Sequence, residues 1–207
     1  MPENLHKLFV ISSPSGGGKT SLINKLFEDS RSANFEKSIS DTSRQKRQGD
    51  LEGKDYYFLS EKDFKDKIKK EEYVEYATVF GNFYGTSKEE IKTKYNNSNL
   101  ILELDWQGAY AVKEIFDDAK LIFLVPPSLD DLKQRLIKRN LDSSEAIESR
   151  LSEAKKEISK SEMYDYLVLN DDFHKAFEDL SQILFEGISP IDFNSRASKD
   201  LIKRLVE

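Results

Sequence analysis

Cysteine is absent from this chain of 207 residues, which excludes a disulfide framework and a thiolate metal site. Histidine occurs only twice, at His6 and His174, and neither lies in a catalytic pattern. No apolar stretch approaches the roughly 20 residues of a membrane span, and the N-terminus lacks the pattern of a secretory signal peptide. Because a chain without thiols also suits a reducing compartment, these absences together predict a cytoplasmic protein.

A strong charge of one sign is missing as well. The chain has 32 basic and 38 acidic residues, for a net charge of −6. The totals therefore predict no nucleic-acid partner and no membrane surface, although local basic clusters could still bind anions. Apolar residues make up 38% of the chain and charged residues 34%, a globular balance that can fill one core. The length suits one core with a smaller inserted lobe and leaves open whether the protein is a monomer or a homo-oligomer.

Short apolar runs at wide spacing organise the rest of the chain. They are LFVI (8–11), LILEL (100–104), LIFLV (121–125) and YLVL (166–169). Unalternating runs of this kind are typical of strands buried on both faces of a parallel sheet. Helical periodicity lies between them, at 20–27, 110–116 and 129–138. This alternation predicts a doubly wound α/β domain.

The region from 34 to 88 differs in composition and pattern, with aromatic pairs and alternating segments such as YVEYATV. It predicts an inserted lobe of antiparallel strands with one helix from Ser60 to Glu71. The core would then comprise residues 1–33 and 89–207. The polar segment 140–149 lies between two helical patterns, and we expect it to be mobile.

The segment LFVISSPSGGGKTS (8–21) raises the question of why three consecutive glycines precede a lysine. In the phosphate-binding P-loop, G-x-x-x-x-G-K-[ST], backbone N–H groups converge on phosphate oxygens, so side chains must be absent. Gly18, Lys19 and Thr20 match the pattern, and Ser13 stands where the first glycine belongs. Lys19 would reach the β- and γ-phosphates and the Thr20 hydroxyl would ligate Mg²⁺. The alternative, a flexible turn, does not require Lys-Thr at that offset. The expected ATP-binding loop also includes Ser15, Gly16, Gly17 and Ser21.

A second anion site is indicated by Arg44 and Arg47, which lie three apart in SISDTSRQKRQGD (38–50). Guanidinium groups bind phosphate bidentately. Two arginines alone are more often solvated surface than ligands, so the interpretation depends on the motifs that follow.

Those motifs, read in order, resemble guanylate kinase over residues 7–186. They are S-x-P-S-G-x-G-K-[ST], S-x-x-x-R-x-x-R-x-G, E-x-A-x-V-F-G-N-x-Y-G-T-S, D-W-Q-G, V-P-P-S and YLVLNDD. The resemblance implies a P-loop core with a GMP-binding lobe at 34–88 and a helical lid at about 135–150. It also implies transfer of the γ-phosphoryl group of ATP to GMP, giving ADP and GDP, with Mg²⁺ as cofactor.

Carried over to this sequence, the resemblance implies a GMP site built from the lobe. The GMP phosphate would meet Arg44, Arg47, Tyr56 and Tyr84, and guanine would meet Ser40, Glu75 and Thr86. The chemistry of the base supports Glu75, because guanine offers two adjacent donors to a carboxylate, whereas adenine presents a lone pair in place of the ring N–H. A site whose buried polar groups are left unpaired by the wrong base discriminates strongly. Taken alone, Glu75 would read as an exposed strand residue.

The sequence also departs from the family pattern. Asp50 stands where the family usually has glutamate, Glu103 where it has aspartate, and Lys46 where it has proline. Each acid keeps its charge but changes its reach by a methylene. We therefore expect Asp50 and Glu103 in the GMP site, with water-mediated contact as the alternative to direct contact.

Asp105 follows a buried strand, at the end where open α/β sheets bind ligands. The resemblance places it near Mg²⁺ and the GMP phosphate, the ion being held through water, while a helix N-cap is the alternative. The resemblance also makes Arg135, Arg139 and Arg150 lid residues that close over the triphosphate, although basic residues on such helices are usually solvated. Asn170 is a candidate for adenine recognition.

No general base is expected, because the attacking phosphate oxygen is already ionised at neutral pH. In-line positioning and neutralisation of charge would then supply catalysis, with Lys19, Arg44, Arg135 and Arg150 as the catalytic cations. Two alternatives stay open: a non-catalytic guanylate-kinase-like module that binds protein ligands, and a monophosphate kinase for another base. Such modules typically lose the loop lysine, which this chain keeps.

Overall fold

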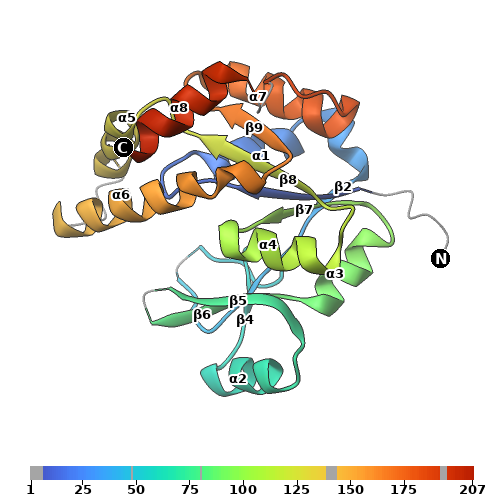
Figure 1. Cartoon of the computed structure of the whole chain (residues 1–207). Coiled ribbons are helices and arrows are strands. Elements are labelled where there is room, and N and C mark those ends of the chain that lie inside the picture. The colour runs from blue at the N-terminus through green and yellow to red at the C-terminus, as the bar shows by residue number, and fades with distance from the viewer. Residues whose placement is uncertain (1–6, 48, 80, 139–143, 192–194) are drawn as a thin grey trace.

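A computed structural model describes residues 7–47, 49–79, 81–138, 144–191 and 195–207, and its centre is a five-stranded parallel sheet (Figure 1). The strand order is β2-β7-β1-β8-β9, and every neighbouring pair is parallel. The strands are β1 (Leu8–Ser12), β2 (Phe35–Lys37), β7 (Asn99–Glu103), β8 (Lys120–Val125) and β9 (Tyr166–Leu169). The predicted parallel α/β core is thereby confirmed.

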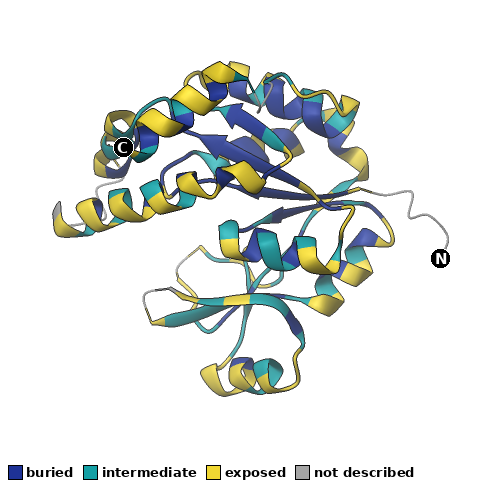
Figure 2. Ribbon diagram, viewed as in Figure 1, coloured by how far each residue is buried: buried dark blue, intermediate teal, exposed yellow. Residues whose placement is uncertain are grey.

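Alternation along the strands divides the core between the two faces of this sheet. In β1, Leu8 and Val10 join one apolar cluster, while Phe9 and Ile11 join the other. Helices α1 (Lys19–Phe27) and α7 (Phe173–Ser181) cover the Phe9 face. The Leu8 face is covered by α3 (Lys88–Tyr95), α4 (Trp106–Ile115), α6 (Ser144–Ser159) and α8 (Arg196–Val206). Buried strands between exposed helix surfaces are visible in Figure 2.

A smaller sheet, with the order β4-β3-β6-β5, forms a separate lobe below the core in Figure 1. Its elements are β3 (Asp41–Thr42), β4 (Tyr57–Phe58), α2 (Glu61–Lys69), β5 (Tyr73–Val79) and β6 (Asn82–Ser87). The ring of Phe64 on α2 stacks on Tyr73 and Phe83, with ring centroids 4.5 and 5.3 Å apart. This aromatic stack gives the lobe an apolar centre of its own.

Two predictions about the lobe need correction. Residues 35–37 were expected in the lobe, but β2 pairs with β7 at the edge of the core sheet. The β3–β4 pair is parallel, whereas β3–β6 and β5–β6 are antiparallel as expected. The chain can run β3 and β4 in parallel because 14 residues, 43–56, return it between them.

The prediction of a mobile segment at 140–149 is wrong for residues 144–149, which form the start of α6. An ion pair of 2.7 Å between Lys133 on α5 (Leu129–Lys138) and Glu148 joins the two helices. Residues 140–143 lie outside the described residues. Ser128 caps α5, because its hydroxyl accepts the Asp131 N–H at 3.0 Å.

The remaining elements are short helical segments, η1 (Ser30–Asn34), η2 (Ser161–Met163) and η3 (Gln182–Glu186). The last helix, α8, buries Ile202 and Leu205. Within the described ranges, every helix is too short or too polar to cross a bilayer.

Candidate active site

The glycine loop joins β1 to α1 at the carboxyl end of the sheet, where its conformation explains the glycines. Gly18 is left-handed, with φ of 89°, and it caps α1 in a conformation that a side chain would strain. Gly17 donates its N–H to the Pro14 carbonyl at 2.8 Å, and a Cβ on Gly17 would lie 2.9 Å from that oxygen. The loop is therefore closed to side chains for both conformational and steric reasons.

Lys19 projects from the start of α1 toward the end of β7. Its Nζ donates to the Leu104 carbonyl at 3.0 Å. Burial of the ammonium end lowers the pKa of Lys19, and the carboxylates of Glu103, Glu157 and Asp105 oppose that shift. The cation thus lies in a partly dehydrated, acidic setting in which a phosphate chain would be a strong partner.

The side chains of Thr20, on α1, and Glu103, at the end of β7, are in contact. The Thr20 hydroxyl donates to Oε1 of Glu103 at 2.5 Å, and Nζ of Lys37 lies 2.6 Å from Oε2. Burial disfavours the Glu103 carboxylate, but Lys19 and Lys37 outweigh it and lower the pKa of Glu103. Both oxygens of Glu103 are therefore engaged by protein groups.

Arg44 is fixed above the aromatic residues of the lobe. Its guanidinium lies 2.8 Å from Asp50 and 5.4 Å from the centre of the Tyr56 ring. The rings of Tyr56 and Tyr84 meet edge to face at 5.7 Å. Asp50 also accepts the Arg47 N–H at 2.7 Å, and this bond, with the Arg44 guanidinium, lowers the pKa of Asp50. The structure thus brings four predicted phosphate ligands and Asp50 together, with Asp50 bound to the two arginines.

Glu75 on β5 pairs in register with Thr86 on β6. Burial raises the pKa of Glu75 to about 7, and the neighbouring Thr86 opposes the shift. Thr86 is fully buried, and its hydroxyl has no hydrogen-bond partner within the described part of the chain. Gly108 lets α4 approach, because a Cβ there would lie 3.1 Å from the Glu75 side chain. A buried acid beside a hydroxyl without a partner offers an acceptor and a donor to the polar edge of a base.

Asp105 caps α4, accepting the Gly108 N–H at 2.9 Å, so the N-cap alternative is correct. Capping takes only one of its oxygens. Asp105 also lines a hollow of about 210 Å³ together with Glu75, so the residue faces the lobe. The predicted metal role and the capping role are therefore compatible.

The predicted lid arginines reach the glycine loop from two helices. Arg135 on α5 donates to the Asn170 carbonyl at 2.7 Å, and Arg150 on α6 lies 3.1 Å from the Ser15 hydroxyl. Nδ2 of Asn170 donates to the Gly17 carbonyl at 2.7 Å. Asn170 is thus a support for the loop, a role that sequence reasoning missed. Arg139 lies outside the described residues.

These residues surround two neighbouring hollows. One, of about 360 Å³, is lined by Lys19, Thr20, Lys37, Ser38, Ser40, Lys54, Asp55, Tyr56 and Glu103. The other, of about 380 Å³, is lined by Gly16, Gly18, Ser21, Arg135, Lys138, Asn170, Asp171 and Phe173. The glycine loop therefore borders both spaces.

Lys37 and Glu157 were not predicted from the sequence. Burial raises the pKa of Glu157 to about 7, while Lys19 opposes the shift. Glu157 lies seven residues after Arg150 on α6, so helical periodicity could have placed it on the same face. Nothing in the local pattern around Lys37 indicates its role, because that role depends on the pairing of β2 with β7.

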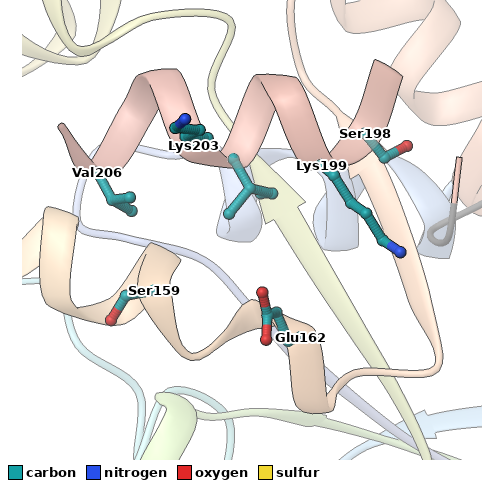
Figure 3. Close-up of a pocket in the computed structure, with 7 residues that line it drawn as sticks. Ser159, Glu162, Ser198, Lys199, Lys203 and Val206 are labelled. Atoms are coloured by element: carbon teal, nitrogen blue, oxygen red, sulfur yellow. The ribbon is translucent and has the colours of Figure 1, made fainter. Parts of the chain in front are cut away.

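A further groove, of about 750 Å³, runs between α8 and the end of α6 (Figure 3). Its lining includes Ser159, Glu162, Lys199 and Lys203. None of the predicted site residues lines it, so it does not belong to the site built around the glycine loop.

Comparison with known proteins gives concordant matches. The family model described as guanylate kinase matches residues 5–187. A guanylate kinase from Wolbachia sp. subsp. Brugia malayi (strain TRS) is 45% identical over 184 residues, covering 88% of this chain and 93% of the relative. One from Hahella chejuensis (strain KCTC 2396) is 47% identical over 178 residues, covering 86% and 85%.

A solved structure of a guanylate kinase also matches this chain. The crystal structure of guanylate kinase from Anaplasma phagocytophilum has a TM-score of 0.71 and 32% identity, covering 99% of this chain and 98% of that one. The match extends through the P-loop core and the lobe described above. On the sequence and structural matches together, the chain belongs to the guanylate kinase family of kinases.

Proposed function

We propose that this protein transfers the γ-phosphoryl group of ATP to GMP, reversibly, giving ADP and GDP. The observation that carries the proposal is the shared cavity of about 360 Å³, in which Lys19 and Thr20 of the glycine loop face Ser40 and Tyr56 of the lobe. A donor held by the loop and an acceptor held by the lobe would meet there for direct transfer.

ATP would bind through its phosphates to the N–H groups of the glycine loop and to Lys19. The loop is positioned for this by β1 and by the Asn170 bond to Gly17. Arg135 and Arg150, from the two lid helices, would add positive charge around the transferred group. Closure of these helices would exclude water and so prevent hydrolysis of ATP.

Mg²⁺ is the cofactor that fits this site. The Thr20 hydroxyl donates its proton to Glu103, which leaves its oxygen lone pairs for a metal. Within the described ranges no group of three or more histidine or acidic residues could hold an ion alone. The donor set therefore fits an ion held by Thr20, by Asp105 through water, and by the ATP phosphates. When bound, such an ion neutralises charge on the phosphates.

GMP would bind in the lobe. Arg44, Arg47, Tyr56 and Tyr84 would hold its phosphate, with Asp50 orienting the Arg44 guanidinium and accepting the backbone N–H of Arg47. Ionised Glu75 would accept from the two donors of guanine, and Thr86 or Ser40 would donate to the guanine carbonyl. Glu103, with both oxygens already engaged, would organise the site without touching GMP directly.

A coupled assay of ADP release with Mg-ATP and each common nucleoside monophosphate tests this proposal. Turnover that depends on GMP supports it. Turnover with none of the acceptors would favour the non-catalytic module, and faster turnover with AMP or UMP would favour a kinase for another base.

A further inference from the structure

Lys37 sits on the wall of the shared cavity, on a strand outside the predicted site. Its Nζ lies 2.6 Å from Oε2 of Glu103, and both side chains line the cavity beside Lys19 and Thr20. Glu103 is the more buried partner, with 17% of its side chain exposed against 35% for Lys37.

The pairing of strands creates this contact. In the parallel register of β2 and β7, Lys37 lies opposite Ile101. Glu103 is two residues beyond Ile101 and therefore on the same face of the sheet. Lys37 at the end of β2 thus reaches diagonally to Glu103 at the end of β7, at the sheet edge where the phosphates would lie.

Without Lys37, the Glu103 carboxylate would lose its direct ion pair and present a negative charge, only partly offset by Lys19, to an anionic ligand. Glu103 cannot withdraw, because its other oxygen accepts the Thr20 hydroxyl at 2.5 Å. Like charges at such range, in a partly buried cavity, repel appreciably.

We propose that Lys37 is a positioning residue that neutralises Glu103, so that Glu103 can hold Thr20 without repelling the phosphates of the substrates. The inference rests on the proposed function in taking the ligands of this cavity to be phosphates. It assigns Lys37 no contact with the reacting atoms.

The test compares binding of GMP and guanosine by calorimetry, without Mg²⁺ or ATP. Guanosine offers the same base and ribose but no phosphate. We expect Lys37→Met to weaken GMP about tenfold and to leave guanosine unchanged, and Lys37→Arg to keep most of the GMP affinity. The double variant Lys37→Met/Glu103→Gln should recover most of the loss, because the carboxylate charge is gone while Gln still accepts from Thr20.

The matched control is Lys69→Met, which removes one positive charge from an exposed pair with Asp66 on α2 and should leave both affinities unchanged. Equal weakening of GMP and guanosine by Lys37→Met, no weakening at all, or no recovery in the double variant would each overturn the proposal. If the unaltered protein binds no GMP, the proposed function fails instead. Titration of the same variants with tripolyphosphate then tests Lys37 independently. We expect Lys37→Met to weaken tripolyphosphate binding and the double variant to recover most of that affinity.

Discussion

At the scale of single residues, Lys19 carries the largest expected effect. Its ammonium end is buried against the Leu104 carbonyl, and the residue lines the cavity in which we propose that the phosphates bind. We expect Lys19→Ala to lower turnover by about 10³-fold or more, roughly 4 kcal/mol of barrier, because a preorganised cation opposite the transferred group is lost.

Steady-state ADP release measures this effect. Lys25→Ala is the matched control, since Lys25 lies on the same helix but in an exposed pair with Glu28. Near-normal turnover of Lys19→Ala, with the control also normal, would contradict the phosphate role of Lys19.

The protonation of Glu75 gives a second prediction at this scale. Burial raises its pKa to about 7, so below that pH the free protein holds a protonated acid that cannot accept from both guanine donors. GMP affinity should therefore fall as the pH drops below 7, by about tenfold at pH 6 if only the ionised form binds.

Glu75→Gln should lose this pH dependence and bind GMP far more weakly, with ATP affinity nearly unchanged. Titration of the GMP phosphate is common to both proteins and cancels in the ratio of their affinities. A ratio that stays constant from pH 6 to pH 8 would count against Glu75 as the guanine acceptor. The same raised pKa means that Glu75 contributes folding stability that is fully present below its unfolded pKa near 4.5 and is lost as the pH rises through 7.

At the scale of elements, Asn170 links the end of β9 to the glycine loop. Its side chain donates to Gly17, and its carbonyl accepts from Arg135 on α5. This arrangement supports the loop for any donor nucleotide. We therefore expect Asn170→Ala to raise the KM for ATP and for GTP as phosphoryl donors by the same factor, about tenfold, for loss of a buried hydrogen bond.

Donor kinetics with the two nucleotides separate this role from adenine recognition. Loss confined to ATP would show that Asn170 reads the base, as the sequence suggested. Asp172→Ala, which removes the exposed cap of α7 close by, is the control and should leave the KM for each of the two donors unchanged.

The elements also show what could be predicted from the sequence and why. The apolar run LIFLV predicted a buried strand, and it lies in β8. The helical period of apolar residues at 129–138 predicted a helix, and these residues form α5. Both signals are local in the sequence. The placement of β2 was missed because FEK has no apolar run, and its membership of the core sheet comes only from pairing with β7.

The candidate site divides in the same way. The glycine loop, Arg44 and Glu75 were predicted from motifs, because their chemistry dictates residue type and spacing. The partners that hold them were not: Lys37 beside Glu103 and Asn170 beside Gly17 are contacts between segments distant in the sequence. Asp50 was expected in the site, but its bond to Arg44, six residues away, depends on the conformation of the loop that carries both residues.

At the scale of the whole molecule, α8 completes the core although the family match ends at residue 187. Ile202 and Leu205 are buried in the apolar cluster that includes β1, β7 and β8, and Lys155 on α6 donates to the Glu207 carbonyl at 2.9 Å. We expect Leu205→Ala to lower the free energy of unfolding by about 2–4 kcal/mol, because it leaves a cavity in the core.

Urea unfolding measures this loss, and Lys199→Ala, on the exposed side of the same helix, should change stability by less than about 0.5 kcal/mol. A Leu205→Ala variant as stable as the unaltered protein would mean that α8 is not part of the cooperative core.

The central claim is that one cavity brings a donor on the glycine loop to an acceptor in the lobe. Turnover of Mg-ATP measured with GMP, AMP, UMP and CMP tests it most directly. The account predicts rapid ADP release with GMP and at least about 10²-fold lower kcat/KM with the others, because Glu75 and Thr86 would be left unpaired by any other base. Comparable rates with all four acceptors, or ADP release that does not depend on an acceptor, would contradict it.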